Sequence, residues 1–439
     1  MPRARDELQI PTTAFFWGEF GKVKNLRLAN KGAGQGRWAR RTLILVLFLV
    51  LAVLAGRPLL SAETPSSYDS LRLFTEALFE ISQKYVYPKS EEDMIYGSLR
   101  GMMNSLDPDS SFLTPQEYKS YLGGKDEPTA EAGVEVIIKD NLATLTSVID
   151  GGPAAAAGLK PGDHVLKING QMVRNLTTQE MARRFRGAPG TSLKLQIIRN
   201  GALKPLDITL TFAPLTENTV TSQMLNDSIG YLRLRYFNDA TPKEFGLALK
   251  SLQSQNPRGL ILDLRNNARG SMEQAVRTAS LLLGDKEIVA AKGRAVGSQE
   301  TFRGKERDLV TKVPMPTVVL IDQGTARAAE ILAAALHDQY QATLLGAKSL
   351  GLCGLTKAMP LQDGSALIMT VAQCYTPGGL KIQGKGLEPN VQGKTPKEKE
   401  KEKEKEKGPV VAEPKKAPTP GQDPWVLQAV EILKGGKKA

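Results

Sequence analysis

The chain has 439 residues, enough for two or three domains, and its 41% hydrophobic and 24% charged residues match an ordinary globular protein. Its formal net charge is +12, and half of that excess lies in residues 1–41, which hold nine basic and three acidic residues. No module of interleaved basic and aromatic residues is recognisable, so the charge favours membrane orientation and argues against nucleic acid as a partner.

An uninterrupted apolar run, residues 42–56, follows this basic N-terminal tail. Its 15 residues fit the apolar region of a signal peptide, whereas a membrane-spanning helix needs about 20. A cleavage site follows Ala62, but a tail of 41 residues is long for a signal peptide, so residues 42–62 are either a signal peptide or a signal anchor. Both interpretations predict export, to the periplasm or anchored in the inner membrane through residues 42–56.

Residues 64–125 are predicted to be a helical N-terminal segment. A first helix is indicated by apolar residues at steps of three and four, namely Leu71, Phe74, Leu78 and Ile81. A second helix is indicated by Met94, Leu99, Met102 and Met103, and it should end before Asp107-Pro108. A short third helix should start at Thr114 or Pro115.

Residues 126–213 alternate short apolar runs with Gly and Pro, as a small β-rich domain does. The most specific stretch runs from Gly152-Pro153-Ala154 through Lys160-Pro161-Gly162-Asp163 to the strand Val165–Ile168 and the pair Asn169-Gly170. This stretch is similar to the PDZ domains of exported proteases. The resemblance implies that the domain captures the C-terminal tails of proteins by adding them as a strand beside a helix.

The resemblance also implies which residues bind such a tail. Ala132, Gly133 and Val134 stand at the loop whose backbone N–H groups receive the terminal carboxylate. The facing helix, at about residues 178–185, carries Met181 and Phe185, which either line the groove or belong to the core of the domain.

Residues 218–392 alternate predicted strands and helices, which implies an α/β domain. Gly259–Arg265 and Val318–Asp322 are apolar enough for buried strands, and Ala328–Asp338 is predicted to be a helix. The segment between the last two reads Asp322-Gln323-Gly324-Thr325-Ala326-Arg327-Ala328-Ala329-Glu330. It resembles the nucleophile segment S-A-S-A-S-E of the carboxyl-terminal processing peptidases, also called tail-specific proteases. The resemblance extends over roughly three quarters of the chain and implies a multidomain protein with a crotonase-like α/β peptidase-type core.

Four functional positions of that family are altered here. The position of the serine nucleophile is Arg327, that of the general-base lysine is Leu352, that of a nearby glutamine is Thr356, and that of an oxyanion-hole glycine is Arg269. Arginine offers no nucleophilic oxygen, and leucine accepts no proton. The sequence therefore predicts a peptidase scaffold without its Ser/Lys chemistry.

Two alternatives concern the same region. Thr325 lies two residues from the nucleophile position, and Lys348 or Lys357 is conceivable as a base, which would rebuild an active site. The two arginines should converge on the former oxyanion site, where Glu330 pairs with one of them or where both bind an anion such as a peptide carboxylate.

The remaining features predict no metal or cofactor. Cys353 and Cys374 match no metal motif and are expected to be buried thiols, with a disulfide as the alternative after export. His164 and His337 stand apart and have no ligand-like neighbours. A Lys/Glu/Pro linker, residues 393–423, should precede a C-terminal helix at 424–434 that packs back on the body.

The sequence thus predicts an exported PDZ protein with a degenerate peptidase domain, which binds protein tails as a scaffold or as a regulator of a related active peptidase. An active serine endopeptidase that processes protein C-termini is the competing interpretation. A structural envelope protein is the third.

Overall fold

The computed structural model describes residues 67–123, 130–139, 142–174, 176–202, 204–215, 218–294, 297–310, 315–394 and 419–435. The predicted basic tail, the signal segment at 42–62 and most of the Lys/Glu/Pro linker lie outside these residues. Within the described residues, no helix is both long and apolar enough to cross a membrane.

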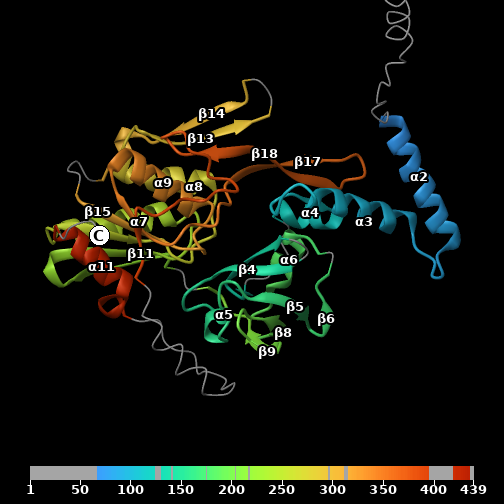
Figure 1. Ribbon diagram of the computed structural model, residues 1–439, viewed down its shortest axis with the longest axis horizontal. Coiled ribbons are helices and arrows are strands. Elements are labelled where there is room, and N and C mark those ends of the chain that lie inside the picture. The colour runs from blue at the N-terminus through green and yellow to red at the C-terminus, as the bar shows by residue number, and fades with distance from the viewer. Residues whose placement is uncertain are drawn as a thin grey trace, which may run out of the picture. The chain divides into compact units, whose positions relative to one another are not determined.

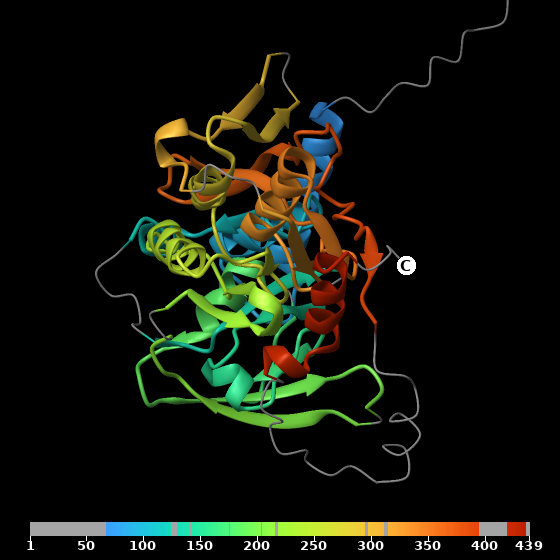
Figure 2. The same ribbon diagram turned by 90° about the vertical axis from the view of Figure 1, so that its left-hand side faces the viewer.

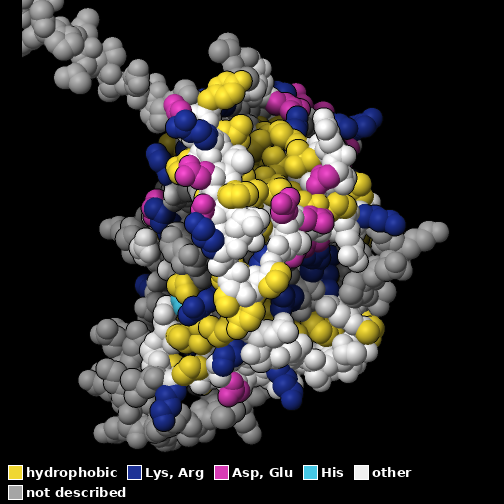
Figure 3. Space-filling view, turned by 90° about the vertical axis from the view of Figure 1, so that its right-hand side faces the viewer, with side chains coloured by type: hydrophobic (Ala, Val, Ile, Leu, Met, Phe, Trp, Pro, Cys, Tyr) yellow, Lys and Arg dark blue, Asp and Glu magenta, His cyan; other side chains and the backbone are white. Residues whose placement is uncertain are grey.

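Three helices form most of the N-terminal segment, as predicted. They are α2 (Ser67–Lys84), α3 (Glu91–Asn104) and α4 (Pro115–Tyr121). Ser90 caps α3 by accepting a hydrogen bond from the N–H of Asp93, and Thr114 caps α4 with Pro115 in its first turn. Large apolar side chains of α2 are exposed, among them Leu71, Leu73 and Phe79. Figure 3 shows one face of the molecule, on which hydrophobic side chains gather in the upper part and charged side chains lie around them.

The second described region is a β-rich domain (green in Figure 1). Its main sheet has the order β3-β4-β5-β8-β9, with bounds Val134–Lys139, Leu142–Val148, His164–Ile168, Ser192–Ile198 and Leu206–Thr211. β6 (Gln171–Met172) pairs with β5, and β2 (Ala130–Glu131) pairs with β7 (Arg186–Gly187). The helices are α5 (Pro153–Ala156) and α6 (Thr178–Arg184), and α6 lies beside β3.

The α/β domain is built on a second sheet of order β10-β11-β12-β15-β16-β19. Its strands are Val220–Leu225, Ile229–Leu234, Gly259–Asp263, Thr317–Ile321, Thr343–Gly346 and Val391–Gln392. All neighbours are parallel except β10 and β11, and β12 and β15 are buried along their whole length. Runs that are apolar throughout are typical of parallel strands covered on both faces.

Helices cover both faces of this sheet. One core cluster packs α7 (Thr241–Gln253), α8 (Met272–Leu283) and α9 (Ala328–Tyr340) against one side. The other side holds α11 (Pro424–Leu433), whose Val426 and Ala429 are buried against the strands, as the sequence predicted (Figures 1 and 2).

A third sheet flanks the helices. It has the order β1-β18-β13-β14, and β17 pairs with β18. Its strands are β1 (Ser111–Leu113), β18 (Ala366–Tyr375), β13 (Glu287–Gly293), β14 (Gln299–Arg303) and β17 (Gly354–Pro360). Short 3-10 turns occur at Asn226–Ser228, Glu306–Asp308 and Pro420–Gln422. The N-terminal segment and the α/β domain therefore meet in one sheet through β1 and β18.

Candidate functional site

The turn between β15 and α9 presents Arg327 in a strained conformation. Its φ is +54° and its ψ is −117°, a region that residues with side chains rarely adopt. Such backbone costs about 1–3 kcal/mol and is concentrated at functional sites. The N–H of Arg327 donates to the carbonyl of Leu352 at 2.9 Å and to Glu330 at 3.2 Å, and these contacts fix the turn.

Glu330 is fully buried beneath this turn and holds the neighbouring loop. Its carboxylate accepts hydrogen bonds from the Ser349 hydroxyl at 2.5 Å and from the N–H groups of Gly351 at 2.7 Å and Leu352 at 3.0 Å. Burial raises the pKa of Glu330 to about 7, although these donors act in the opposite direction. Of the two alternatives for the arginines, a direct pair with Glu330 is disfavoured, because its oxygens receive backbone and hydroxyl donors. The charge of Glu330 nevertheless helps to raise the pKa of Arg327.

The guanidinium of Arg327 pairs with carboxylates of other elements. Its Nη2 donates to Asp109 at 2.5 Å, and its Nη1 donates to the carbonyl of Ala268 at 3.2 Å and lies 3.5 Å from Glu135. Burial alone would lower the pKa of Arg327, but Asp109 and Glu135 outweigh it and raise that pKa.

Arg269 makes a more extensive set of contacts. Its Nε donates to Glu135 at 2.6 Å, while Nη1 and Nη2 donate to the two oxygens of Glu131 at 2.8 Å each. Burial would lower the pKa of Arg269, and Glu135 and Glu131 together raise it. Both arginines therefore face carboxylates of the protein, which disfavours the alternative of a bound anion.

Leu352 and Thr356 are the other two positions at which the sequence predicts a change. The Leu352 side chain is buried in an apolar cluster with Ile137, Ala268 and Ala326. Thr356 lies half-buried on β17. Neither supplies a base to the turn, since leucine has no ionisable group and threonine does not accept a proton at neutral pH.

A cavity of about 530 Å³ opens at these residues. Arg269, Arg327 and Thr356 line it, together with Asp109. Its apolar lining combines both domains: Val134, Val136 and Phe185 from the β-rich domain, and Met272, Ala328, Ile331 and Leu355 from the α/β domain. The groove beside β3 and the region of the altered positions are therefore one continuous space.

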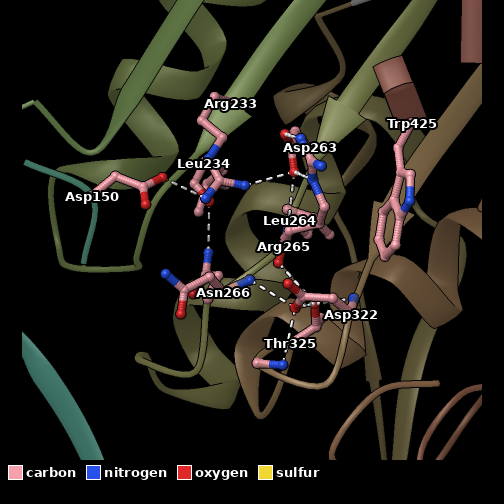
Figure 4. A network of polar contacts seen from close by, with 12 residues as sticks. Asp150, Arg233, Leu234, Asp263, Leu264, Arg265, Asn266, Asp322, Thr325 and Trp425 are labelled. Carbon is pink, nitrogen blue, oxygen red and sulfur yellow. Dashed lines mark hydrogen bonds and ion pairs between the residues drawn. The ribbon is translucent and has the colours of Figure 1, made fainter. Parts of the chain in front are cut away.

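Thr325 does not face this cavity. It is fully buried, its hydroxyl donates to the carbonyl of Leu264 at 2.9 Å, and it accepts from the N–H of Asp322 at 2.9 Å. Figure 4 shows Thr325 inside this network beside Asp322. Of the two candidate bases, Lys348 pairs with Glu388 at 2.5 Å and is half-exposed. The contacts of Thr325 are those of a residue that supports the turn.

A second charged cluster lies in the same view, with Asp263 at its centre. The carboxylate of Asp263 accepts from Arg233 at 2.6 Å, from Arg265 at 2.6 Å and from the Tyr231 hydroxyl at 2.8 Å. Burial would raise the pKa of Asp263, but the two guanidiniums hold it well below its ordinary value. Arg233 also donates to Asp150 at 2.6 Å, which joins the cluster to the β-rich domain (Figure 4).

The predicted tail-binding loop, residues 132–134, leads from β2 into β3 of the β-rich domain. Gly133 has φ +75°, and a Cβ there would lie 2.9 Å from Leu215, so this position requires glycine. The N–H of Ala132 already donates to the carbonyl of Phe185 at 2.8 Å, and Val134 is buried. Met181 is fully buried in the core of the domain, and Phe185 belongs both to that core and to the cavity lining.

The two cysteines form a disulfide, so the expectation of free thiols was wrong. Cys353 lies directly before β17, and Cys374 lies on β18. The N–H of Cys374 donates to the carbonyl of Cys353 at 3.0 Å. Spacing alone could not pair them, because 21 residues separate them and only the folding of β18 beside β17 brings their side chains together.

Sequence reasoning missed the acidic partners Asp109, Glu131 and Glu135. One signal was available, because two arginines predicted to converge in the interior of one site require carboxylates nearby.

Comparisons with known proteins agree with this architecture. The sequence model of peptidase family S41 matches residues 228–392, and that of the PDZ domain matches residues 131–210. The chain is 35% identical over 330 residues to the "Carboxy-terminal-processing protease" of Bartonella bacilliformis, which covers 74% of this chain and 75% of that protein. The chain belongs to the carboxy-terminal processing protease family.

Further members of this serine protease family are also similar to the chain over most of its length. The "Carboxy-terminal processing protease CtpA" of Bacillus subtilis is 32% identical, over 81% of this chain and 76% of that protein. Among solved structures, the "Photosystem II D1 C-terminal processing protease" has a TM-score of 0.61 and 25% identity, over 73% of this chain and 92% of that one. The PDZ domain and the S41 core expected from the sequence are thereby confirmed.

Proposed function

We propose that this member of the carboxy-terminal processing protease family binds the C-terminal tails of proteins through its PDZ domain and does not hydrolyse them. The observation that carries the proposal is the pair Arg327 and Leu352. Arg327 stands on the strained turn with its guanidinium held by Asp109, and Leu352 lies in an apolar cluster. Serine-type hydrolysis needs an activated hydroxyl and a proton acceptor within about 3 Å, and these two side chains supply neither.

A peptidase assay tests the absence of hydrolysis. The purified chain is incubated with an unfolded substrate that ends in a free apolar C-terminus, beside a family member that has the serine and lysine. We expect cleavage only by the latter. Turnover by this chain that disappears in Thr325→Ala would contradict the proposal and favour a rebuilt site.

Tail binding is supported by the cavity that runs beside β3 and α6, whose lining is partly apolar and partly charged. Calorimetry with an apolar-ended peptide and its C-terminal amide tests it, since carboxylate capture requires the free acid. We expect binding of the acid alone, and weaker binding in Gly133→Ala, because a Cβ at Gly133 approaches Leu215 and strains the loop. Equal affinity for acid and amide would exclude carboxylate capture.

A tail-binding protein without hydrolytic activity would act as a scaffold or as a regulator, for which a related active peptidase is a suitable partner. This partner is inferred from shared tail recognition. Co-purification of such a peptidase with the chain, lost on adding the free tail peptide, would support it. Co-purification unaffected by excess peptide would place the contact elsewhere.

We also propose that the body of the chain is exported. The apolar run at 42–56 beside an arginine cluster supports this. The Cys353–Cys374 disulfide supports it independently, because disulfides persist in oxidising compartments. A topology reporter fused after residue 439 should be active outside the cytoplasm, and activity only inside it would refute export.

A further inference from the structure

Strand β3 of the PDZ domain has two faces with different partners. Side chains alternate along a strand, and Val134, Val136 and Ile138 belong to the core of the PDZ domain. The intervening residues Glu135 and Ile137 are directed to the opposite face. Ile137 is buried although it makes no part of the PDZ core, so a different surface covers it.

That surface is formed by the altered catalytic positions. Ile137 packs in the cluster that contains Leu352, and Glu135 accepts from Arg269 at 2.6 Å and lies 3.5 Å from Arg327. Three of the four altered positions therefore contact the two outward residues of one strand.

Arg269 extends this contact around the loop that receives a tail carboxylate. Its guanidinium bonds Glu131 with two nitrogens and Glu135 with the third, and these glutamates bracket residues 132–134. A bidentate guanidinium–carboxylate contact fixes orientation as well as distance. The loop is thus held from both ends by a single side chain of the S41 core.

The neighbouring strand β4 is held at the same end, where Val148 pairs with Val134. The amide of Asn266 receives a hydrogen bond from the N–H of Val148 at 2.8 Å and donates to the carbonyl of Val148. Gly324 allows the close approach, because a Cβ there would lie 3.1 Å from the carbonyl of Thr146. The N–H of Val148 is therefore a backbone donor whose partner belongs to the S41 core.

We propose that Arg269, Arg327 and Leu352 form a docking surface for the outward face of β3, so that the positions used for catalysis elsewhere in the family hold the PDZ domain on the core. The docked PDZ domain closes the shared cavity. A tail bound beside β3 then also contacts Met272, Ala328 and Ile331 of the core, which line the same space. This second part rests on the proposed tail binding, whereas the docking itself does not.

Hydrogen exchange of the full-length chain tests the docking. Opening of the PDZ domain as a unit breaks the bond from Val148 to Asn266, so the exchange rate of this amide reports the open population. The N–H of Asn169, which donates to Lys194 inside the PDZ domain at 2.8 Å, reports unfolding of that domain. Arg277 on α8 is exposed, and Arg277→Ser serves as a matched control for loss of an arginine.

The main variant restores the residue types of the family: Arg269→Gly, Arg327→Ser and Leu352→Lys together. We expect exchange at Val148 to rise at least tenfold with no change at Asn169, and no change at either amide in Arg277→Ser. Unchanged exchange at Val148 would overturn the proposal. If exchange accelerates at both amides because the triple variant unfolds, Glu135→Gln is measured instead. We expect its exchange rate to rise at least threefold at Val148 alone, and no rise there would overturn the docking.

Tail affinity of the same variants tests the second part. We expect Arg269→Gly to weaken binding of the free-acid peptide about tenfold, with Arg277→Ser unchanged. If a variant exchanges its Val148 amide faster but binds the peptide with undiminished affinity, the tail does not contact the core. This result would overturn the second part of the proposal and leave the docking intact. A wild-type chain that binds no tail at all would refute the proposed function, and the exchange result at Val148 would still decide the docking.

Discussion

Two charged clusters lie at the same end of the parallel sheet, and they differ in what they connect. The cluster around Asp263 places one carboxylate between Arg233 and Arg265, mostly within the S41 core. The cluster around Arg269 and Arg327 places core guanidiniums against Glu131 and Glu135 of the PDZ domain. The first stabilises the ends of strands β11 and β12. The second joins the S41 core to the PDZ domain, so the positions at which the sequence predicts altered catalytic residues are also positions of interdomain contact.

The largest expected effect comes from the centre of the first cluster. Asp263→Ala removes the buried carboxylate that lies between two partly buried guanidiniums, and leaves Arg233 with Asp150 and Arg265 with Asp423. Breaking a buried ion pair costs about 3–5 kcal/mol. Arg269→Ala should cost less, about 1–3 kcal/mol, because its partners Glu131 and Glu135 are partly exposed and regain water. Urea unfolding of both variants measures the difference. An Arg269→Ala variant that is destabilised as much as Asp263→Ala would remove the contrast between the clusters.

The next effect concerns the second cluster, because the Cys353–Cys374 disulfide lies beside Leu352, and its removal should destabilise this part of the protein. In Cys353→Ser with Cys374→Ser, a closed loop with a separation of 21 residues is lost. Loop-closure entropy predicts about 3 kcal/mol for a loop of this order, an upper figure because the β17–β18 pairing remains. Exchange of the N–H of Cys374, which donates to the carbonyl of residue 353, should rise in the double variant. Unchanged exchange there would show that strand pairing alone holds Leu352 in place.

A smaller effect concerns pH. Burial raises the pKa of Glu330 to about 7, so between its unfolded value and that pH the folded state binds more protons than the unfolded state. Stability should therefore fall as pH rises from 5 to 8, by about 1–3 kcal/mol. Asp322, whose pKa burial also raises, acts in the same direction.

Glu330→Gln isolates this contribution. The variant lacks the titrating group, so its unfolding free energy should depend less steeply on pH over the same range, whatever its absolute stability. Matching slopes in the two proteins would contradict the raised pKa. Asp263→Asn gives no such change between pH 5 and 8, because the pKa of Asp263 is lowered and its carboxylate stays charged there.

Much of the fold could be predicted from the sequence because its signals are local. Apolar runs located β12 and β15, the helical spacing located α9 and α11, and the Pro-Gly-Asp turn with Asn169-Gly170 located the PDZ domain. A run that is apolar throughout indicates a strand covered on both faces, and a spacing of three and four indicates a helix that buries one face. The PDZ domain was indicated by the resemblance of its turn sequence to a known family.

The contacts of the site could not be predicted because they join residues far apart in the chain. Arg327 pairs with Asp109 across 218 positions, and Arg269 pairs with Glu131 across 138. The sequence indicated that the arginines needed counter-charges but not which carboxylates supply them. The role of Met181 was open for a related reason, since a helix beside a groove also has a face in the core, and Met181 lies on that face.

The turn at Arg327 has a consequence for classification. A φ of +54° is a strained main-chain conformation for a long charged residue, and the contacts around the turn hold it. A comparison of main chains places this protein beside a processing protease with a TM-score of 0.61, and it takes no account of which side chain stands on the turn. If the proposed loss of hydrolysis is correct, the side chains at positions 269, 327 and 352 would serve as a three-residue signature for sorting other chains of the same architecture before any assay.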